Sequence, residues 1–411
     1  MEVVVRKSEV EGVVKAPPSK SYTHRALIAA SLSPLSRIKN PLIADDTLAT
    51  LFSCKKAGAE VWRSKDTMIV GSAEKFEGYF NCMNSGTTLR ILLSLSPATS
   101  SWGVLDGDSS LRKRPNRELC LALKKLGVRV KGIGSDFRAP IKIEGKLKAG
   151  EVEIDGKSSQ FVTSLLFSLP LVGDSVVKVK NLKSKPYVDV TLHVLEESGI
   201  KVEVEGNAYH IYESEYRLRK FVIPPDFSSL SYLIAAGVIG GKVTIEDVTD
   251  SKQGDKVIVD IVREMGGRVS WRGNRIVAEK SELEGIDFDA SDNPDLAPTI
   301  AVLAAVAEGK TRIYNAEHLR MKETDRIQSI CENLKRLGVE VECKQDEIVI
   351  EGGKREFRGV VDSFGDHRIA MAFSLLGLLG ELKVLRAECV SISYPKFFEV
   401  LKKLGADVNA R

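Results

Sequence analysis

The sequence predicts an α/β protein of two domains, each made of three similar repeated units. Two observations lead to this fold class. A pattern of amphipathic helix, glycine and strand recurs six times at a nearly constant interval. Each repeat also contains a helix that is apolar on all sides, which is typical of a buried helix. A fixed period of this kind indicates a repeat architecture.

The repeated pattern is clearest in its glycines. In the first repeat Lys55 and Lys56 end a helix, Gly58 follows, and a strand begins shortly after it. A glycine in this place can take a positive φ and end the helix without steric cost. The six glycines, separated by 69, 72, 67, 72 and 67 residues, are Gly58, Gly127, Gly199, Gly266, Gly338 and Gly405.

The apolar helices distribute the chain evenly over six units. They are expected within residues 26–31, 89–94, 162–169, 230–237, 299–307 and 369–376, and β-rich segments include residues 3–5, 176–179 and 347–350. A chain of 411 residues accommodates two domains of three units each. We predict one domain from residues 15–223 and the other from residues 1–14 with 224–411, because proline pairs within 15–19 and 219–225 favour hinges.

Composition excludes several classes of protein. Charged residues make up 28% of the chain, both signs are mixed, and the net charge of +4 is too small to indicate nucleic-acid binding. No apolar stretch approaches the roughly 20 residues of a membrane span, and residues 1–20 contain acids and no signal-peptide core. We therefore expect a cytoplasmic protein that binds neither membranes nor nucleic acid.

The cysteines and histidines do not form a metal-binding pattern. The cysteines lack Cys-x-x-Cys spacing and the five histidines are scattered, so no metal site is expected. Several cysteines lie in apolar, helix-like contexts, which favours free buried thiols over disulfides. The six cysteines are Cys54, Cys82, Cys120, Cys331, Cys343 and Cys389.

Polar residues and cations precede the buried helices. Ser, Thr, Asn and Asp at these positions are ordinary N-caps, but capping does not explain Lys20, Arg25, Arg90 and Arg368. A helix N-terminus presents free N–H groups and the positive end of its dipole, so added cations indicate an anion-binding site.

Two further basic segments extend this pattern. Lys322 and Arg326 are four residues apart with Glu323 beside them, which predicts one face of an exposed helix, and Arg114 lies in a basic turn. Together these cations suit a ligand with more than one phosphate or carboxylate. No Walker-type loop or complete dinucleotide fingerprint is present, so no nucleotide cofactor is expected.

In order along the chain, seven segments resemble the EPSP synthase family. Each segment alone is a weak signal, but the ordered set is specific and spans nearly the whole chain. The segments are Ser19-Lys20-Ser21 with Arg25, Asn84-Ser85-Gly86-Thr87 with Arg90, residues 111–115, Ser158-Ser159-Gln160, Ser184-Lys185-Pro186-Tyr187, Lys322-Glu323-Thr324-Asp325-Arg326 and Asp366-His367-Arg368.

The resemblance implies a fold and a reaction. The fold is an inside-out α/β barrel in each of two domains, with three βαβαββ-like units per domain and an active site in the cleft between them. The reaction transfers the carboxyvinyl group of phosphoenolpyruvate to the 5-hydroxyl of 3-phosphoshikimate, releases phosphate and belongs to the shikimate pathway to chorismate and aromatic amino acids. It also implies a monomer without cofactors, in which glyphosate competes with phosphoenolpyruvate.

The resemblance also implies which residues bind each substrate. Those for 3-phosphoshikimate are Lys20, Ser21, Arg25, Ser158, Ser159, Gln160, Ser184, Tyr187, Asp295 and Lys322. Those for phosphoenolpyruvate are Lys20, Asn84, Gly86, Arg114, Gln160, Arg326 and Arg368. Further candidates for the site are Thr87, Arg90, His318, His367 and Lys396. Both substrates carry a phosphate and a carboxylate, which a dense set of cations can desolvate.

The reaction needs a base for the hydroxyl proton and an acid for the vinyl methylene. By resemblance, Asp295 is the candidate base and Glu323 the candidate methylene acid, with Lys20 as an alternative proton carrier. Because Glu323 lies between Lys322 and Arg326, we expect its carboxylate to stay ionised until substrate anions offset these two cations.

Two positions depart from the family pattern. His318 stands where relatives often have an asparagine that contacts phosphoshikimate. Ile392 stands where some have a phosphoenolpyruvate-binding lysine, and Lys396 is close to it in sequence.

Two alternatives remain from the sequence. The first is the related enzyme that transfers enolpyruvyl to UDP-N-acetylglucosamine, but that enzyme has Lys-Asn where this chain has Lys20-Ser21, and its reactive cysteine lies on a flexible loop. Cys120 instead lies in a helix pattern. The second is a protein that binds or processes RNA through its phosphates, although no aromatic residues are interleaved with the cations to stack bases.

Overall fold

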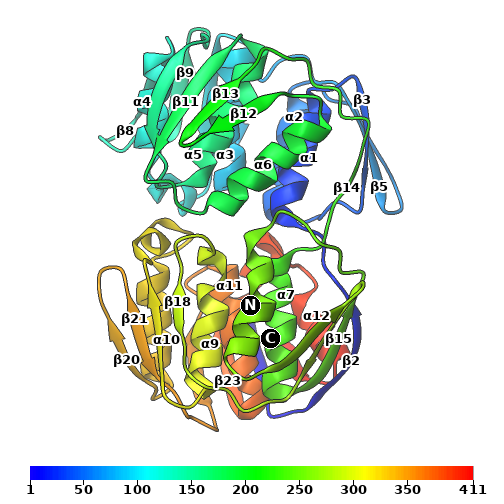
Figure 1. The fold of residues 1–411 in the computed structure, drawn as a ribbon, viewed down its shortest axis with the longest axis vertical. Coiled ribbons are helices and arrows are strands. Elements are labelled where there is room, and N and C mark those ends of the chain that lie inside the picture. Colours follow the sequence, from blue (N-terminus) through cyan, green and yellow to red (C-terminus); the bar gives the residue numbers. More distant parts are fainter. Residues whose placement is uncertain (411) are drawn as a thin grey trace. The chain divides into compact units, whose positions relative to one another are not determined.

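The computed structural model describes residues 1–410 and divides the chain into two compact units. One unit is Pro18–Pro224, and the other combines Met1–Pro17 with Pro225–Arg411. Within residues 1–410, each unit contains three four-stranded sheets and six α-helices. Figure 1 shows the helices and strands of each unit in chain order by colour. The α/β repeat architecture predicted from the sequence is confirmed.

In the unit Pro18–Pro224, each sheet has a parallel pair of strands joined to an antiparallel hairpin. The first sheet has the order β14 (Lys220–Val222), β3 (Leu35–Lys39), β5 (Thr67–Gly71) and β4 (Val61–Ser64). The second has the order β6 (Gly78–Asn81), β7 (Trp102–Asp106), β9 (Arg138–Glu144) and β8 (Arg129–Ile133). The third has the order β10 (Glu151–Asp155), β11 (Ser175–Lys180), β13 (Ala208–Ile211) and β12 (Val202–Glu205).

The helices of this unit alternate between buried and half-exposed. The buried helices are α1 (Lys20–Ser31), α3 (Gly86–Thr99) and α5 (Ser159–Ser168), and the others are α2 (Asp45–Lys56), α4 (Arg117–Lys125) and α6 (Lys185–Glu197). Helices α3 and α5 pack directly against each other, and α6 contacts α1 and α5. The buried helices thus form the core, as their uniformly apolar sequences predict.

The second unit repeats this arrangement. Its first sheet has the order β16 (Arg268–Arg272), β17 (Arg275–Glu279), β15 (Gly241–Glu246) and β2 (Val10–Lys15). Its second has the order β18 (Asp287–Asp289), β19 (Lys310–Tyr314), β21 (Ile348–Glu351) and β20 (Glu340–Cys343). Its third has the order β22 (Arg358–Asp362), β23 (Glu381–Leu385), β1 (Glu2–Arg6) and β24 (Asp407–Ala410), so the N-terminal strand completes the last repeat.

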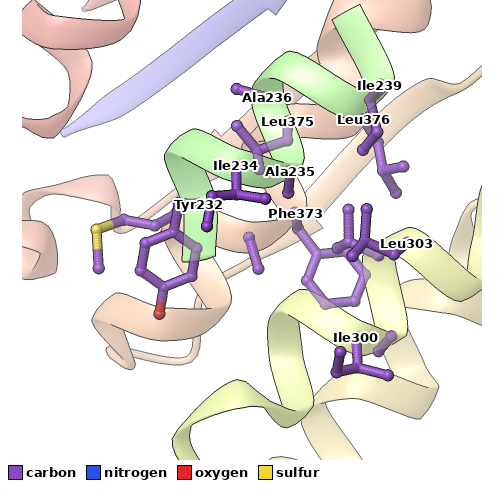
Figure 2. Close-up of a cluster of buried hydrophobic side chains, with 14 of the residues drawn as sticks. Tyr232, Ile234, Ala235, Ala236, Ile239, Ile300, Leu303, Phe373, Leu375 and Leu376 are labelled. Atoms are coloured by element: carbon purple, nitrogen blue, oxygen red, sulfur yellow. The ribbon is translucent and has the colours of Figure 1, made fainter. Parts of the chain in front are cut away.

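Three buried helices form the core of the second unit. They are α7 (Phe227–Gly240), α9 (Ala297–Val306) and α11 (His367–Ser374), and the more exposed helices are α8 (Ile258–Glu264), α10 (Arg326–Arg336) and α12 (Phe397–Lys403). Helix α9 packs against both α7 and α11. Figure 2 shows Ile234 of α7, Leu303 of α9 and Phe373 of α11 gathered in this core.

The six repeated glycines end six helices, as predicted. Their φ angles are +103° at Gly58, +91° at Gly127, +79° at Gly199, +84° at Gly266, +72° at Gly338 and +101° at Gly405. An L-residue with a side chain adopts this region only rarely. None of the helices in the described part of the chain has the length and apolar character that a membrane span requires.

The prediction that all cysteines are free was wrong for one pair. Cys331 of α10 and Cys343 at the end of β20 form a disulfide between residues 12 apart in sequence. The pairing follows from the repeat, in which the helix turns through Gly338 into an adjacent strand. The other four cysteines are free and buried, as expected.

Candidate active site

Five of the residues expected in the site are the first residues of helices. They are Lys20 in α1, Gly86 in α3, Ser159 in α5, Arg326 in α10 and His367 in α11. Four of these helices are capped by the side chains of Ser19, Ser85, Asp325 and Asp366, whereas Ser158 forms no side-chain cap before α5. Each of these helices therefore presents its N–H groups and positive dipole end where the predicted residues lie.

At the start of α3, the side chains of Arg90 and Arg114 converge on Gly86. Arg90 lies one turn into the helix and donates to Oε1 of Gln160 at 2.6 Å and to Oδ1 of Asn116 at 3.1 Å. A Cβ built on Gly86 would lie 3.2 Å from Nη1 of Arg114 and 3.4 Å from Oε1 of Gln160. Because Gly86 has no side chain, the guanidinium groups of Arg114 and Arg90 can approach its backbone closely.

Asn84 and Thr87 complete this group of residues. Nη2 of Arg114 donates to Oδ1 of Asn84 at 2.8 Å, and Nε2 of Gln160 donates to Oγ1 of Thr87 at 3.2 Å. The whole group comprises Asn84, Gly86, Thr87, Arg90, Arg114 and Gln160. It brings together residues that are up to 76 positions apart, from Asn84 to Gln160.

A second group in the same unit lies along α1. Nζ of Lys20 is 2.9 Å from Oδ2 of Asp46, and both side chains are largely buried. A buried pair of this kind holds the ammonium group in one direction. Asp46 was not among the predicted site residues, although the Asp45-Asp46 pair at the start of α2 is visible in the sequence.

Arg25 ties α1 to α6. Its guanidinium donates to the backbone oxygens of Ser21 at 2.9 Å and Tyr187 at 3.1 Å, and to Oγ1 of Thr191 at 2.8 Å. Burial lowers the pKa of Arg25 to about 10, so the side chain stays charged at neutral pH. Ser184, the residue before α6, takes a left-handed φ of +56° and sets the direction of that helix.

In the other unit, acids and cations alternate around Asp295. Nη1 of Arg326 donates to Oδ1 of Asp295 at 2.8 Å, and Nη2 of Arg368 donates to Oδ2 at 2.7 Å. Arg326 also donates to Asp366 at 2.7 Å and to Glu323 at 2.7 Å. This group, called the Asp295 cluster below, comprises Asp295, Lys322, Glu323, Arg326, Asp366 and Arg368.

The electrostatics of the Asp295 cluster follow from burial and close opposite charges. Burial disfavours the charged form of Asp295, but Arg368, Lys322 and Arg326 outweigh this effect and hold the pKa of its carboxyl well below the usual range. Burial also lowers the pKa of Lys322, and Asp295 only partly offsets this. Asp295 is therefore an anion at neutral pH, and Lys322 is the cation in this cluster that gives up a proton most readily.

The helical face predicted for Lys322 and Arg326 was wrong. Lys322 ends the 3-10 helix Glu317–Met321 with ψ of −157°, and α10 begins only at Arg326 because Asp325 caps it. Both cations instead lie close to Asp295. Nζ of Lys322 is 3.9 Å from Oδ1 of Asp295, and Nη1 of Arg326 is 2.8 Å from the same oxygen. Their proximity thus depends on a residue from another segment and not on helical spacing.

The remaining candidates lie at different positions. His318 is buried in the 3-10 helix Glu317–Met321, and His367 is buried at the start of α11 beside Asp366. Ile392 is buried at the end of the 3-10 helix Ala387–Ile392. Lys396 is exposed before α12, and within residues 1–410 no hydrogen bond or ion pair connects it to the Asp295 cluster.

Cys120 lies within α4 and is fully buried. Burial raises the pKa of its thiol to about 12, so it is not a nucleophile at neutral pH. Among the residues that the structure describes, no group of three or more His, Cys, Asp or Glu side chains is arranged to hold a metal ion.

The chain matches a known family over nearly its whole length. Residues 4–401 match the model of EPSP synthase (3-phosphoshikimate 1-carboxyvinyltransferase). A protein of Archaeoglobus fulgidus named 3-phosphoshikimate 1-carboxyvinyltransferase is 61% identical, with 99% of each chain covered. A protein of the same name from Methanocaldococcus jannaschii is 43% identical and covers 100% of this chain and 99% of its own.

Solved structures show the same fold. An EPSP synthase from Acinetobacter baumannii superposes with a TM-score of 0.83 at 25% identity, and 100% of both chains is covered. The enolpyruvyl transferase NikO from Streptomyces tendae superposes with a TM-score of 0.78 at 19% identity, covering 99% of this chain and 98% of its own. At that identity the second likeness concerns the fold alone.

Proposed function

This chain belongs to the EPSP synthase (3-phosphoshikimate 1-carboxyvinyltransferase) family, and from this premise we propose how its residues carry out the family reaction. The enzyme transfers the carboxyvinyl group of phosphoenolpyruvate to the 5-hydroxyl of 3-phosphoshikimate and releases phosphate. This is a step of the shikimate pathway.

We propose that phosphoenolpyruvate is bound by residues from both units. These residues are Lys20, Asn84, Gly86, Arg114, Gln160, Arg326 and Arg368. The observation that carries the proposal is the convergence of Arg326 and Arg368 on one carboxylate, at 2.8 and 2.7 Å. Two guanidinium groups that hold one carboxylate in this way have the geometry that a phosphate or carboxylate of the substrate needs.

Eight of the residues proposed for 3-phosphoshikimate lie in or directly before α1, α5 and α6, and the other two belong to the Asp295 cluster. The full set is Lys20, Ser21, Arg25, Ser158, Ser159, Gln160, Ser184, Tyr187, Asp295 and Lys322. Hydroxyl groups at helix N-termini and cations beside them suit a phosphate ester. The role of Arg25 includes positioning α6, because its guanidinium donates to Tyr187 and Thr191.

Because each substrate needs residues of both units, we propose that the substrates lie between them and that binding draws the units together. Small-angle X-ray scattering tests this step. The radius of gyration should fall when 3-phosphoshikimate is added, and an unchanged radius would contradict closure. We also propose that the protein is a monomer and is located in the cytoplasm. Light scattering on the purified protein tests the oligomeric state.

For proton transfer, we propose Asp295 as the base for the 5-hydroxyl and Glu323 as the methylene acid, with Lys20 as an alternative carrier. Asp295 is ionised, as a base must be, and substrate anions would compete for the two arginines that lower its basicity. Glu323 accepts a hydrogen bond from Arg326 at 2.7 Å, so binding of an anion by Arg326 would change its environment.

The decisive experiment is phosphate release from the purified chain. Release should require both phosphoenolpyruvate and 3-phosphoshikimate, and UDP-N-acetylglucosamine should not replace the latter. The buried, unreactive Cys120 supports this specificity over the related UDP-N-acetylglucosamine enzyme. Phosphate release from phosphoenolpyruvate with UDP-N-acetylglucosamine as the acceptor, and none with 3-phosphoshikimate, would instead favour the UDP-N-acetylglucosamine reaction.

A further inference from the structure

We propose that Asp108 is a positioning residue that fixes the amide orientation of Asn84 and, through it, the guanidinium of Arg114. The inference rests on the proposed function, in which Asn84 and Arg114 bind phosphoenolpyruvate. Asp108 lies in the loop between β7 and α4.

Asn84 lies between a group that only accepts and a group that only donates. Its Nδ2 donates to Oδ2 of Asp108 at 2.7 Å, and its Oδ1 accepts from Nη2 of Arg114 at 2.8 Å. An ionised carboxylate has no proton to give and a guanidinium has no lone pair to offer. The amide of Asn84 can therefore satisfy both neighbours in only one of its two orientations.

The second oxygen of Asp108 fixes the carboxylate itself. Oδ1 accepts from the backbone N–H groups of Ser110 at 3.0 Å and Leu111 at 2.8 Å. The backbone N–H of Asp108 in turn donates to the carbonyl of Met83 at 2.8 Å, next to Asn84 in sequence. The loop thus holds Oδ1 toward its own backbone and leaves Oδ2 directed at Asn84.

The same loop has an independent anchor that does not involve Asn84. Nε and Nη2 of Arg112 donate to the two oxygens of Asp106 at 2.8 and 2.7 Å, and Asp106 also accepts from Gly107 at 2.8 Å. Loosening this anchor should disturb the loop without reversing any amide. Arg112→Ala therefore provides a matched control for loop mobility.

The isosteric substitution Asp108→Asn gives a sharp test. An asparagine should keep its Oδ1 on the N–H groups of Ser110 and Leu111, because it forms this turn well. Its Nδ2 then faces Nδ2 of Asn84, so the Asn84 amide must reverse and turn its N–H groups toward Arg114. Two donors then oppose each other at the substrate site.

Asp108→Ala removes the carboxylate without adding a donor. The loop loses its cap, but the amide of Asn84 keeps its orientation because Arg114 still requires an acceptor. We expect Asp108→Asn to raise the KM for phosphoenolpyruvate by about tenfold or more, and Asp108→Ala by only about threefold. Asp108→Glu, which keeps the acceptor, should stay closest to the original protein. The KM for 3-phosphoshikimate should change little in all three.

If Asp108 only capped the loop, Asp108→Ala would raise the KM for phosphoenolpyruvate more than Asp108→Asn does. The reason is that asparagine preserves the cap and alanine does not. An Asp108→Ala variant with a KM for phosphoenolpyruvate equal to or above that of Asp108→Asn would overturn the proposal. An Arg112→Ala variant with the same KM change as Asp108→Asn would also overturn it, since mobility alone would then suffice.

A stability measurement tests the network without turnover. In a double-mutant cycle, Asp108→Asn should destabilise the protein less when Arg114→Ala is present, because the opposed donor has been removed. Additive effects on chemical denaturation would reject the link between Asp108 and Arg114. Absence of phosphate release from the unmodified protein would instead count against the proposed function, and the cycle would still decide the link.

Discussion

Asp295 is held between Arg326 and Arg368, each of which donates to a different oxygen of its carboxylate, at 2.8 and 2.7 Å. Arg326 is only 1% exposed and also contacts Glu323 and Asp366. The carboxylate proposed as a base is thus bound by the two cations proposed to bind a substrate anion. If both proposals hold, binding of that anion would release Asp295 to act as a base.

Replacing Asp295 with asparagine should abolish most of the activity. Asp295→Asn keeps the shape of the side chain but removes its capacity to take a proton, so kcat should fall by about 100-fold or more. Phosphate release under saturating substrates measures this, with circular dichroism as the check on folding. A kcat near that of the original protein would remove Asp295 from the base role.

The same variant should reveal a pH-dependent contribution of Asp295 to stability. Its pKa is held well below the usual range in the folded protein, so its stabilising effect is fully present above the unfolded pKa of about 3.9. The effect is lost as the pH falls toward the folded pKa. The Tm difference between the original protein and Asp295→Asn should be constant above about pH 5 and shrink below about pH 4. A difference that stays constant down to pH 3 would contradict this ion pairing.

Removing Arg326 should affect both stability and substrate use. Arg326→Ala leaves the carboxylates of Asp295, Glu323 and Asp366 without their shared cation, which should cost about 3–5 kcal/mol of unfolding free energy. The KM for phosphoenolpyruvate should rise, while affinity for 3-phosphoshikimate should change much less.

Urea denaturation and calorimetric titration with 3-phosphoshikimate test these two expectations. Arg320→Ala is a matched control, because Arg320 pairs with Asp325 in the neighbouring segment but not with Asp295. If Arg326→Ala instead lost 3-phosphoshikimate binding and kept its phosphoenolpyruvate kinetics, Arg326 would belong to the 3-phosphoshikimate site.

An added methyl group at Gly86 should affect phosphoenolpyruvate and glyphosate unequally. The methyl would lie 3.2 Å from Nη1 of Arg114, and Gly86 is helical, so its backbone tolerates alanine. Crowding of this kind typically costs about 1–3 kcal/mol. Glyphosate is the larger ligand along this wall by family resemblance, so Gly86→Ala should raise its inhibition constant more than it raises the KM for phosphoenolpyruvate.

Saturation and inhibition curves on both proteins test this, with thermal melting as a control. Equal losses for the two ligands, or a sharply lower Tm, would show that Gly86 serves the packing of α3 and not the ligand site.

The disulfide should stabilise the unit that contains it. Closing a loop between residues 12 apart constrains the unfolded chain by about 3 kcal/mol in the chain-entropy model. The double variant Cys331→Ser with Cys343→Ser, or reduction of the original protein, should therefore lower the Tm. Cys54→Ser is the control that alters a buried thiol without opening a loop. A Tm that does not respond to reductant would show that the bond contributes nothing.

Much of the fold could be predicted because its features depend on residues that are close in sequence, and the same pattern recurs in all six repeats. Gly58 and its five equivalents end helices at positive φ, and the uniformly apolar helices are buried, since both features depend on residues close in sequence. The capping residues before α1, α3 and α11 were visible for the same reason.

Contacts between distant segments could not be predicted in this way. Lys322 and Arg326 looked like helical neighbours, whereas Asp325 begins the helix and Asp295, about 30 residues away, brings the two cations together. The disulfide was missed because no motif marks its spacing. The contacts of Asp46 with Lys20 and of Asp108 with Asn84 depend on which segments the repeats bring together.

The position of β1 has a consequence for synthesis of the protein. Strand β1 pairs with β23 and β24, which lie at the opposite end of the chain, while all of Pro18–Pro224 is translated between them. That contiguous unit has all of its strand partners before the ribosome reaches β23, so it is expected to fold first. Strand β1 must meanwhile remain without its sheet. Its apolar residues Val3, Val4 and Val5, which are buried in the folded protein, are therefore open to premature association until β23 and β24 are synthesised.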